Sequence, residues 1–200
     1  MIKKVSNKLA NWLVTKSYNE DKYEIVVFGL EYILSSIVSI GSILFIGWAI
    51  GLFKEVTVFL LTAIPFRWLS GGAHSSTFWG CYWISIITSI GFPLFSQYQL
   101  FDIIHSEQWT IGIALFSSIL MFLFAPSNAV HYEEEKSIRL LILRLGSIAY
   151  PYLWYLVATK LLDDSVLYQV SMCGLAWQTF TTTPFGYFTF KRFDRLKFFT

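Results

Sequence analysis

A histidine and a cysteine lie seven residues apart in this sequence, and together these two residue types could carry out nucleophilic chemistry. His74 follows a Gly-Gly pair, and Cys81 lies in the apolar segment after it. A cysteine thiol has a pKa of about 8.5 and reacts as its thiolate, so an imidazole that accepts its proton is the usual activator. The pair therefore predicts an acyl-transfer site. The alternative is that His74 is an interfacial polar residue and Cys81 a small packing residue.

The spacing of the pair requires a break in the chain. On one continuous helix, seven residues rise about 10.5 Å, which is more than an imidazole and a thiol can bridge. Gly71 and Gly72 precede the histidine, and glycine readily adopts the backbone conformations that end a helix. We therefore expect a bend that carries the histidine, followed by a new helix that carries the cysteine and is capped by Ser75 or Ser76.

The composition indicates that the segments positioning this pair are embedded in a lipid bilayer. Hydrophobic residues make up 55% of the chain, aromatic residues 19% and charged residues only 14%, whereas soluble domains carry roughly 25% charged residues. The net charge of +2 comes without a basic block, which argues against nucleic acid as a partner. Cys81 and Cys173 lie in separate apolar segments and lack a CxxC neighbour, so neither a disulfide framework nor a zinc site is expected.

The apolar segments predict an all-α integral membrane protein with one domain over residues 1–200. They recur along the whole chain, so we expect no removable signal peptide. An amphipathic helix over residues 2–16 is expected to lie at the membrane interface. Six transmembrane segments are then predicted, over residues 25–53, 56–69, 78–95, 109–125, 138–158 and about 166–188.

The second of these segments is short. Its fourteen residues reach only about 21 Å, against a hydrocarbon core of about 30 Å. We expect it to be tilted into a thinned bilayer or to form a re-entrant pair with the third segment.

The distribution of basic residues predicts the orientation of the chain. With both termini in the cytoplasm, thirteen of the fifteen Lys and Arg residues lie on the cytoplasmic side, and only Lys54 and Lys160 lie outside. Such a bias is typical of the positive-inside rule. It places the break at Gly71 and Gly72, and with it the predicted active site, at the cytoplasmic boundary.

The same stretch resembles the motif of a known family. The accessory gene regulator B family (AgrB) consists of bacterial membrane peptidases that mature cyclic quorum-sensing peptides. It shows a Gly-Gly-x-His pattern with a cysteine seven residues after the histidine, in chains of about this length and topology. The Phe124-Ala125-Pro126 step is similar to the way the family leaves its fourth span. The matching motif residues are Arg67, Gly71, Gly72, His74 and Cys81.

The resemblance implies a reaction. Cys81 would attack a peptide bond of a short membrane-associated propeptide, and His74 would act as base and then as acid. A Cys or Ser of the substrate would then attack the resulting thioester and close a thiolactone or lactone ring. The resemblance further implies a bacterial cell membrane location, a homodimer and no cofactor.

Five other residues are candidate auxiliary residues. Arg67 either binds a substrate carboxylate or polarises the attacked carbonyl, or it is a snorkelling topology anchor. Ser75 either orients the histidine or caps a helix, and capping is the favoured interpretation. Glu31 lies inside the first predicted span, where a carboxylate is costly, and we expect a structural or substrate-contact role. Arg139 and Arg144, at the inner end of the fifth span, are candidate contacts for an acidic substrate tail.

The loop after the fourth span departs from the family pattern. Similar proteins have a Lys-rich loop there, which suits an acidic substrate tail, whereas this chain has Glu133 to Glu135. His131 and these glutamates lack the HExxH arrangement of a metal site, so we expect a solvated acidic loop and no bound metal. Cys173 is expected to serve helix packing.

Two hypotheses from other classes compete with the peptidase. A transport or export component would use the break at Gly71 and Gly72 as a binding point, as the interrupted helices of transporters do, but the second half of the sequence has no matching break. The second competing hypothesis is a non-catalytic membrane scaffold for a signalling partner. A neighbouring short reading frame with an amphipathic start, a central Cys or Ser and an acidic end would favour the peptidase.

Overall fold

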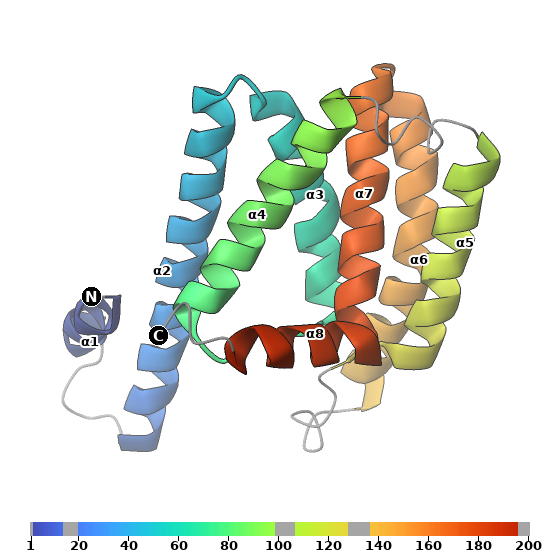
Figure 1. The fold of residues 1–200 in the computed structure, drawn as a ribbon. Coiled ribbons are helices and arrows are strands. Elements are labelled where there is room, and N and C mark those ends of the chain that lie inside the picture. Colours follow the sequence, from blue (N-terminus) through green and yellow to red (C-terminus); the bar gives the residue numbers. More distant parts are fainter. Residues whose placement is uncertain (1, 14–19, 99–106, 128–136, 196–200) are drawn as a thin grey trace.

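The fold is built from α-helices. The computed structural model describes residues 2–13, 20–98, 107–127 and 137–195, and every regular element in these ranges is an α-helix (Figure 1). In chain order the helices are α1 (Ile2–Leu13), α2 (Glu20–Ala49), α3 (Phe53–Ser70), α4 (Phe78–Gln97), α5 (Glu107–Phe124), α6 (Ser137–Leu161), α7 (Ser165–Thr182) and α8 (Pro184–Arg195).

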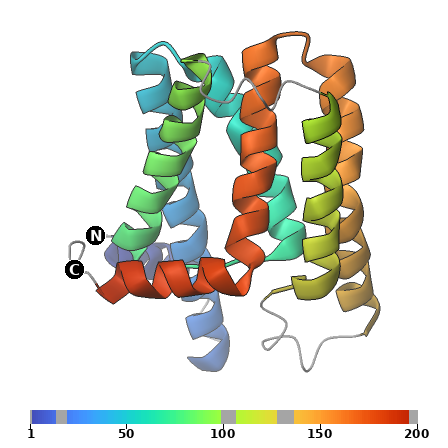
Figure 2. The same cartoon turned by 45° about the vertical axis from the view of Figure 1, so that its right-hand side comes forward.

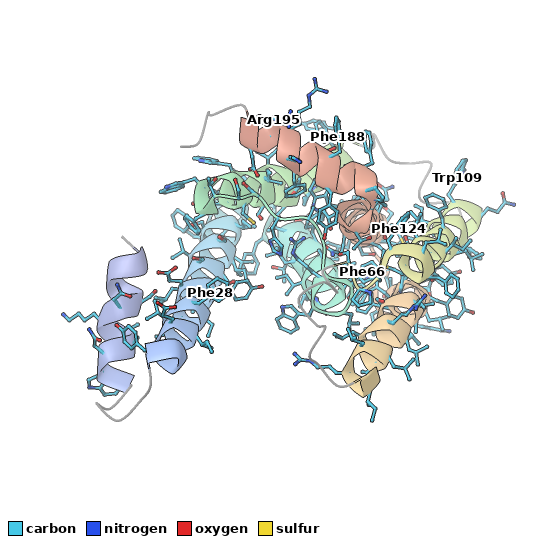
Figure 3. The ribbon with its side chains drawn as sticks, turned by 90° about the horizontal axis from the view of Figure 1, so that it is seen from below. Phe28, Phe66, Trp109, Phe124, Phe188 and Arg195 are labelled. Carbon is cyan, nitrogen blue, oxygen red and sulfur yellow. The ribbon has the colours of Figure 1, made fainter. Side chains whose placement is uncertain are left out.

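Helices α2 to α7 run alternately up and down, and the first and last helices, α1 and α8, both lie towards the lower end of the bundle (Figure 1). Helices α3 and α7 pack against each other at the centre, α2 and α4 lie on one side of this pair, and α5 and α6 lie on the other. Helix α1 packs against α2 at the edge (Figure 3). The loop between α3 and α4 therefore lies at the lower end, next to α8.

Among the described residues, three helices are long and apolar enough to cross a membrane, over Tyr23–Ala49, Phe78–Gln97 and Ile138–Leu161. Helix α3 extends 18 residues, or about 27 Å, and runs from one end of the bundle to the other rather than re-entering from the same end (Figure 1). The count of six membrane crossings and the interfacial location of α1 remain predictions.

The predicted end of the last span was wrong. Helix α7 ends at Thr182, and α8 turns away to run across the lower ends of α4 and α7 (Figure 2). Thr183 has extended backbone angles and its side chain accepts a hydrogen bond from the Gly186 N–H at 3.2 Å. Pro184 then starts the new helix, a position that suits a residue without an N–H. The continuous apolar composition of residues 166–188 concealed this corner.

The end of the first predicted span was also wrong. Helix α2 ends at Ala49 rather than at Phe53, which instead begins α3. Gly51 has a φ of 78°, in the left-handed region that favours glycine, so the chain reverses within three residues. The predicted span was too long because the residues of this turn are also apolar.

The central pair of helices approaches closely near the middle. A Cβ atom on Gly174 of α7 would lie 3.2 Å from the Phe59 carbonyl oxygen of α3, so only a small residue allows this approach. Neighbouring Cys173 is 3% exposed, in agreement with a packing role. Below it, Phe66 of α3 stacks on Tyr150 of α6 with ring centroids 4.9 Å apart. This packing fixes the lower end of α3, where the candidate site begins (Figure 3).

Candidate active site

The break between α3 and α4 lies at the paired glycines, as the sequence predicts. Helix α3 closes with a hydrogen bond from the Gly71 N–H to the Arg67 carbonyl at 2.9 Å. The φ angles are 71° at Gly71 and 141° at Gly72, values that L side chains rarely adopt. Residues 71–77 form a loop before α4 begins at Phe78. The histidine and the cysteine therefore do not lie on one continuous helix.

The predicted cap of α4 was wrong by one or two residues. Thr77 is the N-cap, and its side chain accepts a hydrogen bond from the Gly80 N–H at 3.1 Å. Ser75, the favoured capping residue, instead donates its hydroxyl to the carboxylate of Asp194 on α8. Cys81 lies at the end of the first turn of α4, with its N–H bonded to the Thr77 carbonyl at 3.2 Å.

Arg67 is the centre of the candidate site. Its Nη2 atom donates to the Ala73 carbonyl at 2.8 Å and lies 3.1 and 3.2 Å from the two ring nitrogens of His74. Cys81 lies within electrostatic range of the same guanidinium. Within the described residues no hydrogen bond joins His74 directly to Cys81, so the arginine is their shared neighbour. Its side chain points into the loop, which is not the geometry of a snorkelling anchor.

His74 is held in its neutral form. Burial against the surrounding protein, and then the adjacent Arg67 cation, lower the pKa of His74 to about 4. His74 is nevertheless an exposed residue of the loop. A neutral imidazole retains a lone pair that can accept a proton, as a general base requires.

Gln178 on α7 is a site residue that the sequence does not reveal. Its side chain is 1% exposed. Its amide Nε2 donates to the Gly71 carbonyl at 2.7 Å and to Ser70 Oγ at 3.1 Å, and its Oε1 accepts from Arg67 Nη1 at 3.4 Å. One buried amide therefore holds both the glycine bend and the arginine. A buried polar residue in an apolar span is the only signal that could have indicated it.

Two further contacts fix the loop. The Ala73 N–H donates to the Thr181 carbonyl at 2.7 Å, which ties the residue before the histidine to the end of α7. After the Phe124-Ala125-Pro126 step, the N–H of Ser127 donates to the Ser70 carbonyl at 3.0 Å. The ends of α5 and α7 thus hold the lower end of α3 and the loop.

The packing around Gly72 gives a stability prediction. A Cβ atom there would lie 2.7 Å from Thr181 Oγ1 and 3.3 Å from Arg67 Nη1, at a φ of +141°. Gly72→Ala is therefore expected to destabilise the protein by about 2 kcal/mol, through overpacking and backbone strain. Thermal unfolding of the purified protein in detergent measures this as a lower unfolding temperature.

Gly41→Ala is the matched control for this substitution. A Cβ atom on Gly41, in the middle of α2, would meet no atom within 4 Å, and alanine is a better helix former than glycine. Its unfolding temperature should equal or exceed that of the wild type. Equal unfolding temperatures for both variants would contradict the tight packing at Gly72.

The other predicted auxiliary residues lie apart from this cluster. Glu31 is on α2, and its Oε1 is buried without a hydrogen-bond partner. Arg144 on α6 donates to the Phe122 carbonyl at 3.3 Å and lies over the Phe122 ring, so it holds the end of α5. Arg139 is exposed on the first turn of α6. The structure does not bring any of these residues into contact with His74 within the described chain, and their substrate contacts remain predictions.

The acidic loop predicted over Glu133 to Glu135, with His131, lies outside the described residues. Within the described ranges, no group of three or more His, Cys, Asp or Glu side chains comes together in a way that could hold a metal ion.

The fold and the site together define a class of protein: an all-helical protein with helices suited to a bilayer, in which a helix break places a histidine and a cysteine around a half-buried arginine. The chain belongs to the accessory gene regulator B family, AgrB, whose model matches residues 5–182. This confirms the family that the motif in residues 67–81 indicated. The match ends with α7 and does not include α8.

Relatives from two bacterial genera agree with this assignment. AgrB-like protein 2 of Clostridium perfringens strain 13 is 27% identical over 208 residues, which cover 97% of each chain. The AgrB-like protein of C. perfringens strain SM101 is 29% identical over 96% of this chain and 94% of its own. An AgrB-like protein of Listeria welshimeri is 28% identical over 62% of this chain and 60% of its own. No solved structure matches the chain.

Proposed function

We propose that this protein is a membrane cysteine endopeptidase that cleaves the C-terminal part of a quorum-sensing propeptide and promotes cyclisation of the remainder. The observation that carries the proposal is the convergence of His74 and Cys81 on the guanidinium of Arg67. Membership of the AgrB family supports a role in the maturation of a signalling peptide. The loop would lie at the cytoplasmic face of a bacterial membrane, reached by a substrate bound to the inner leaflet.

In the first step, the neutral imidazole of His74 takes the proton of the Cys81 thiol while the sulfur attacks the carbonyl carbon of the scissile bond. Arg67 stabilises the negative charge that develops during this attack, because a fixed cation in a desolvated site needs no reorganisation. His74 then gives the proton to the departing amine. The C-terminal fragment leaves with a free amino group, and the N-terminal part remains as a thioester on Cys81.

In the second step, a Cys or Ser of the bound peptide attacks the thioester carbonyl. Its proton passes through His74 to the sulfur of Cys81, so the thiol is regenerated and a thiolactone or lactone ring is released. The attacking group and the thioester belong to the same bound peptide. The attack is therefore intramolecular and avoids the entropic cost of bringing two molecules together. Exclusion of water from the loop would suppress hydrolysis of the thioester.

The test is to detect the covalent intermediate. The purified protein is reconstituted in liposomes with a synthetic propeptide that has an amphipathic start, a central Cys or Ser and an acidic end, then quenched in acid and digested for mass spectrometry. We expect a mass increase equal to the N-terminal part of the propeptide on the peptide that contains Cys81, and its removal by hydroxylamine. Cleavage that proceeds without an adduct on Cys81, or with the adduct on another residue, would overturn the proposal.

A further inference from the structure

Asp194, near the end of α8, reaches the loop that carries the histidine. Its Oδ1 accepts the hydroxyl hydrogen bond of Ser75, and its Oδ2 accepts the Ser76 N–H at 2.9 Å. These two residues directly follow His74 in the chain. One carboxylate from a distant helix therefore binds the loop at two successive positions.

The same interaction extends to the helix that carries the cysteine. Ser75 Oγ also accepts the Thr77 N–H at 3.4 Å, and Thr77 caps α4. A negative charge at a helix N-terminus is favourable, because the first N–H groups of the helix point towards it. A Cβ atom on Gly80 would collide with Ser75 Oγ, so the glycine makes room for the serine. Asp194 thus connects the loop to the first turn of α4.

Packing fixes the position of α8. Phe190 is 5% exposed and packs with Ala73 of the loop and Ile84 of α4. Gly186 allows α8 to turn directly beneath the end of α7, because a Cβ atom there would collide with the Phe180 carbonyl. Figure 3 shows α8 extending from α7 along the lower end of α4, with Arg195 at its far end.

The carboxylate is in its charged form at neutral pH. Desolvation acts to raise the pKa of Asp194, but the hydrogen bonds from Ser75 and Ser76 outweigh it and hold the pKa below its ordinary value. A charged acceptor makes stronger hydrogen bonds than a neutral one. Replacing the carboxylate by an amide would therefore weaken both bonds to the loop.

We propose that Asp194 is a positioning residue of the active site, which holds the loop so that His74 stays against Arg67 and close to Cys81. It acts through Ser75 and Ser76 and does not contact the reacting atoms. The Ala73 contact to α7 fixes the loop before the histidine, and Asp194 fixes it afterwards. The proposal rests on the cysteine peptidase function and adds α8, which lies beyond the residues that match the family, to the site.

The experiment compares Asp194→Asn, Asp194→Glu and the wild type in liposomes with the same synthetic propeptide, and measures cleavage rates from pH 3.5 to 8. We expect Asp194→Asn to slow cleavage about tenfold to a hundredfold, because small displacements of catalytic groups are costly. Asp194→Glu keeps the charge and should restore most of the rate. Asp163→Asn, the same change at an exposed carboxylate between α6 and α7, is the matched control and should not alter the rate.

The pH profile distinguishes positioning from a general loss of folded protein. In the wild type, cleavage should fall as pH approaches the His74 pKa of about 4. Once the loop is released, the imidazole leaves Arg67 and gains water, so its pKa rises and the fall in rate moves towards pH 6.5. A loss of folded protein alone would lower the rate at every pH without changing the pH at which the rate falls. The ionisable groups around His74 and its arginine are Tyr32, Arg67, Cys81, Tyr187 and Asp194.

The outcomes separate the two proposals. If Cys81→Ala is inactive while Asp194→Asn has the wild-type rate and pH profile, Asp194 has no positioning role and the peptidase function stands. If Asp194→Asn has a lower rate but loses activity at the same acid pH as the wild type, a positioning role is also excluded. If Cys81→Ala cleaves as the wild type does, the peptidase function itself is wrong.

Discussion

Replacing Cys81 with alanine is expected to abolish cleavage of the propeptide, lowering the rate by at least about 10⁴-fold, because removal of a nucleophile leaves only the binding contributions to catalysis. The sulfur lies on the first turn of α4, within electrostatic range of Arg67. Alanine keeps the helix and removes only the reacting atom. Quantification of the released C-terminal fragment by mass spectrometry, normalised to the amount of protein in the membrane, measures the effect.

Cys173→Ala is the matched control. This second cysteine is 3% exposed inside α7, where its thiol meets Ser96 of α4, so its loss should leave cleavage within about threefold of the wild type. A Cys81→Ala protein that still releases the fragment at the normal rate would exclude the thioester mechanism. Equal losses in both variants would point to packing rather than chemistry.

His74→Gln is expected to lower the cleavage rate by about 10²- to 10⁴-fold, the usual contribution of a general acid–base. Glutamine can accept the hydrogen bond of Arg67 at this position, but it cannot take up and return a proton. The variant should therefore keep the wild-type unfolding temperature while losing activity. A His74→Gln protein with the wild-type rate would show that another group moves the proton.

The pH dependence of the wild type provides a second check on the histidine. Its folded-state pKa is lowered to about 4, first by burial and then by Arg67, so the active neutral form persists well below the ordinary value of about 6.5. Cleavage that depends on neutral His74 should be retained at pH 5.5 and lost as pH falls through about 4. A fall in the wild-type rate near pH 6.5 would mean that neither burial nor Arg67 lowers the pKa of the imidazole.

The local part of the site follows from the sequence. The paired glycines, the histidine and the cysteine lie within residues 71–81, and a helix break at Gly71 and Gly72 is a property of the backbone of these residues alone. The sequence therefore predicts the loop and its chemistry together. The sequence does not decide whether Arg67 is a membrane anchor or a site residue, because both interpretations need only a cation at the end of a helix.

The distant partners of the site could not be predicted. Gln178 is 111 residues from Arg67, and Asp194 is 119 residues from Ser75. Which residues meet across such separations depends on the packing of α3 against α7 and on the corner at Thr183. The corner lies inside a continuous run of apolar and aromatic residues, where hydropathy does not distinguish a membrane span from a helix that turns along the lower ends of the bundle.

The contacts between the loop and α7 also order the events of biosynthesis. A nascent chain that has been inserted as far as α4 already contains His74 and Cys81, yet the Thr181 carbonyl and the Gln178 amide that hold the bend have not been translated. The loop therefore acquires these two partners only after α7 has been translated. Until α7 has been made, the bend that carries the imidazole lacks these contacts, so the peptidase activity proposed for this chain would begin only after α7 has packed against the loop.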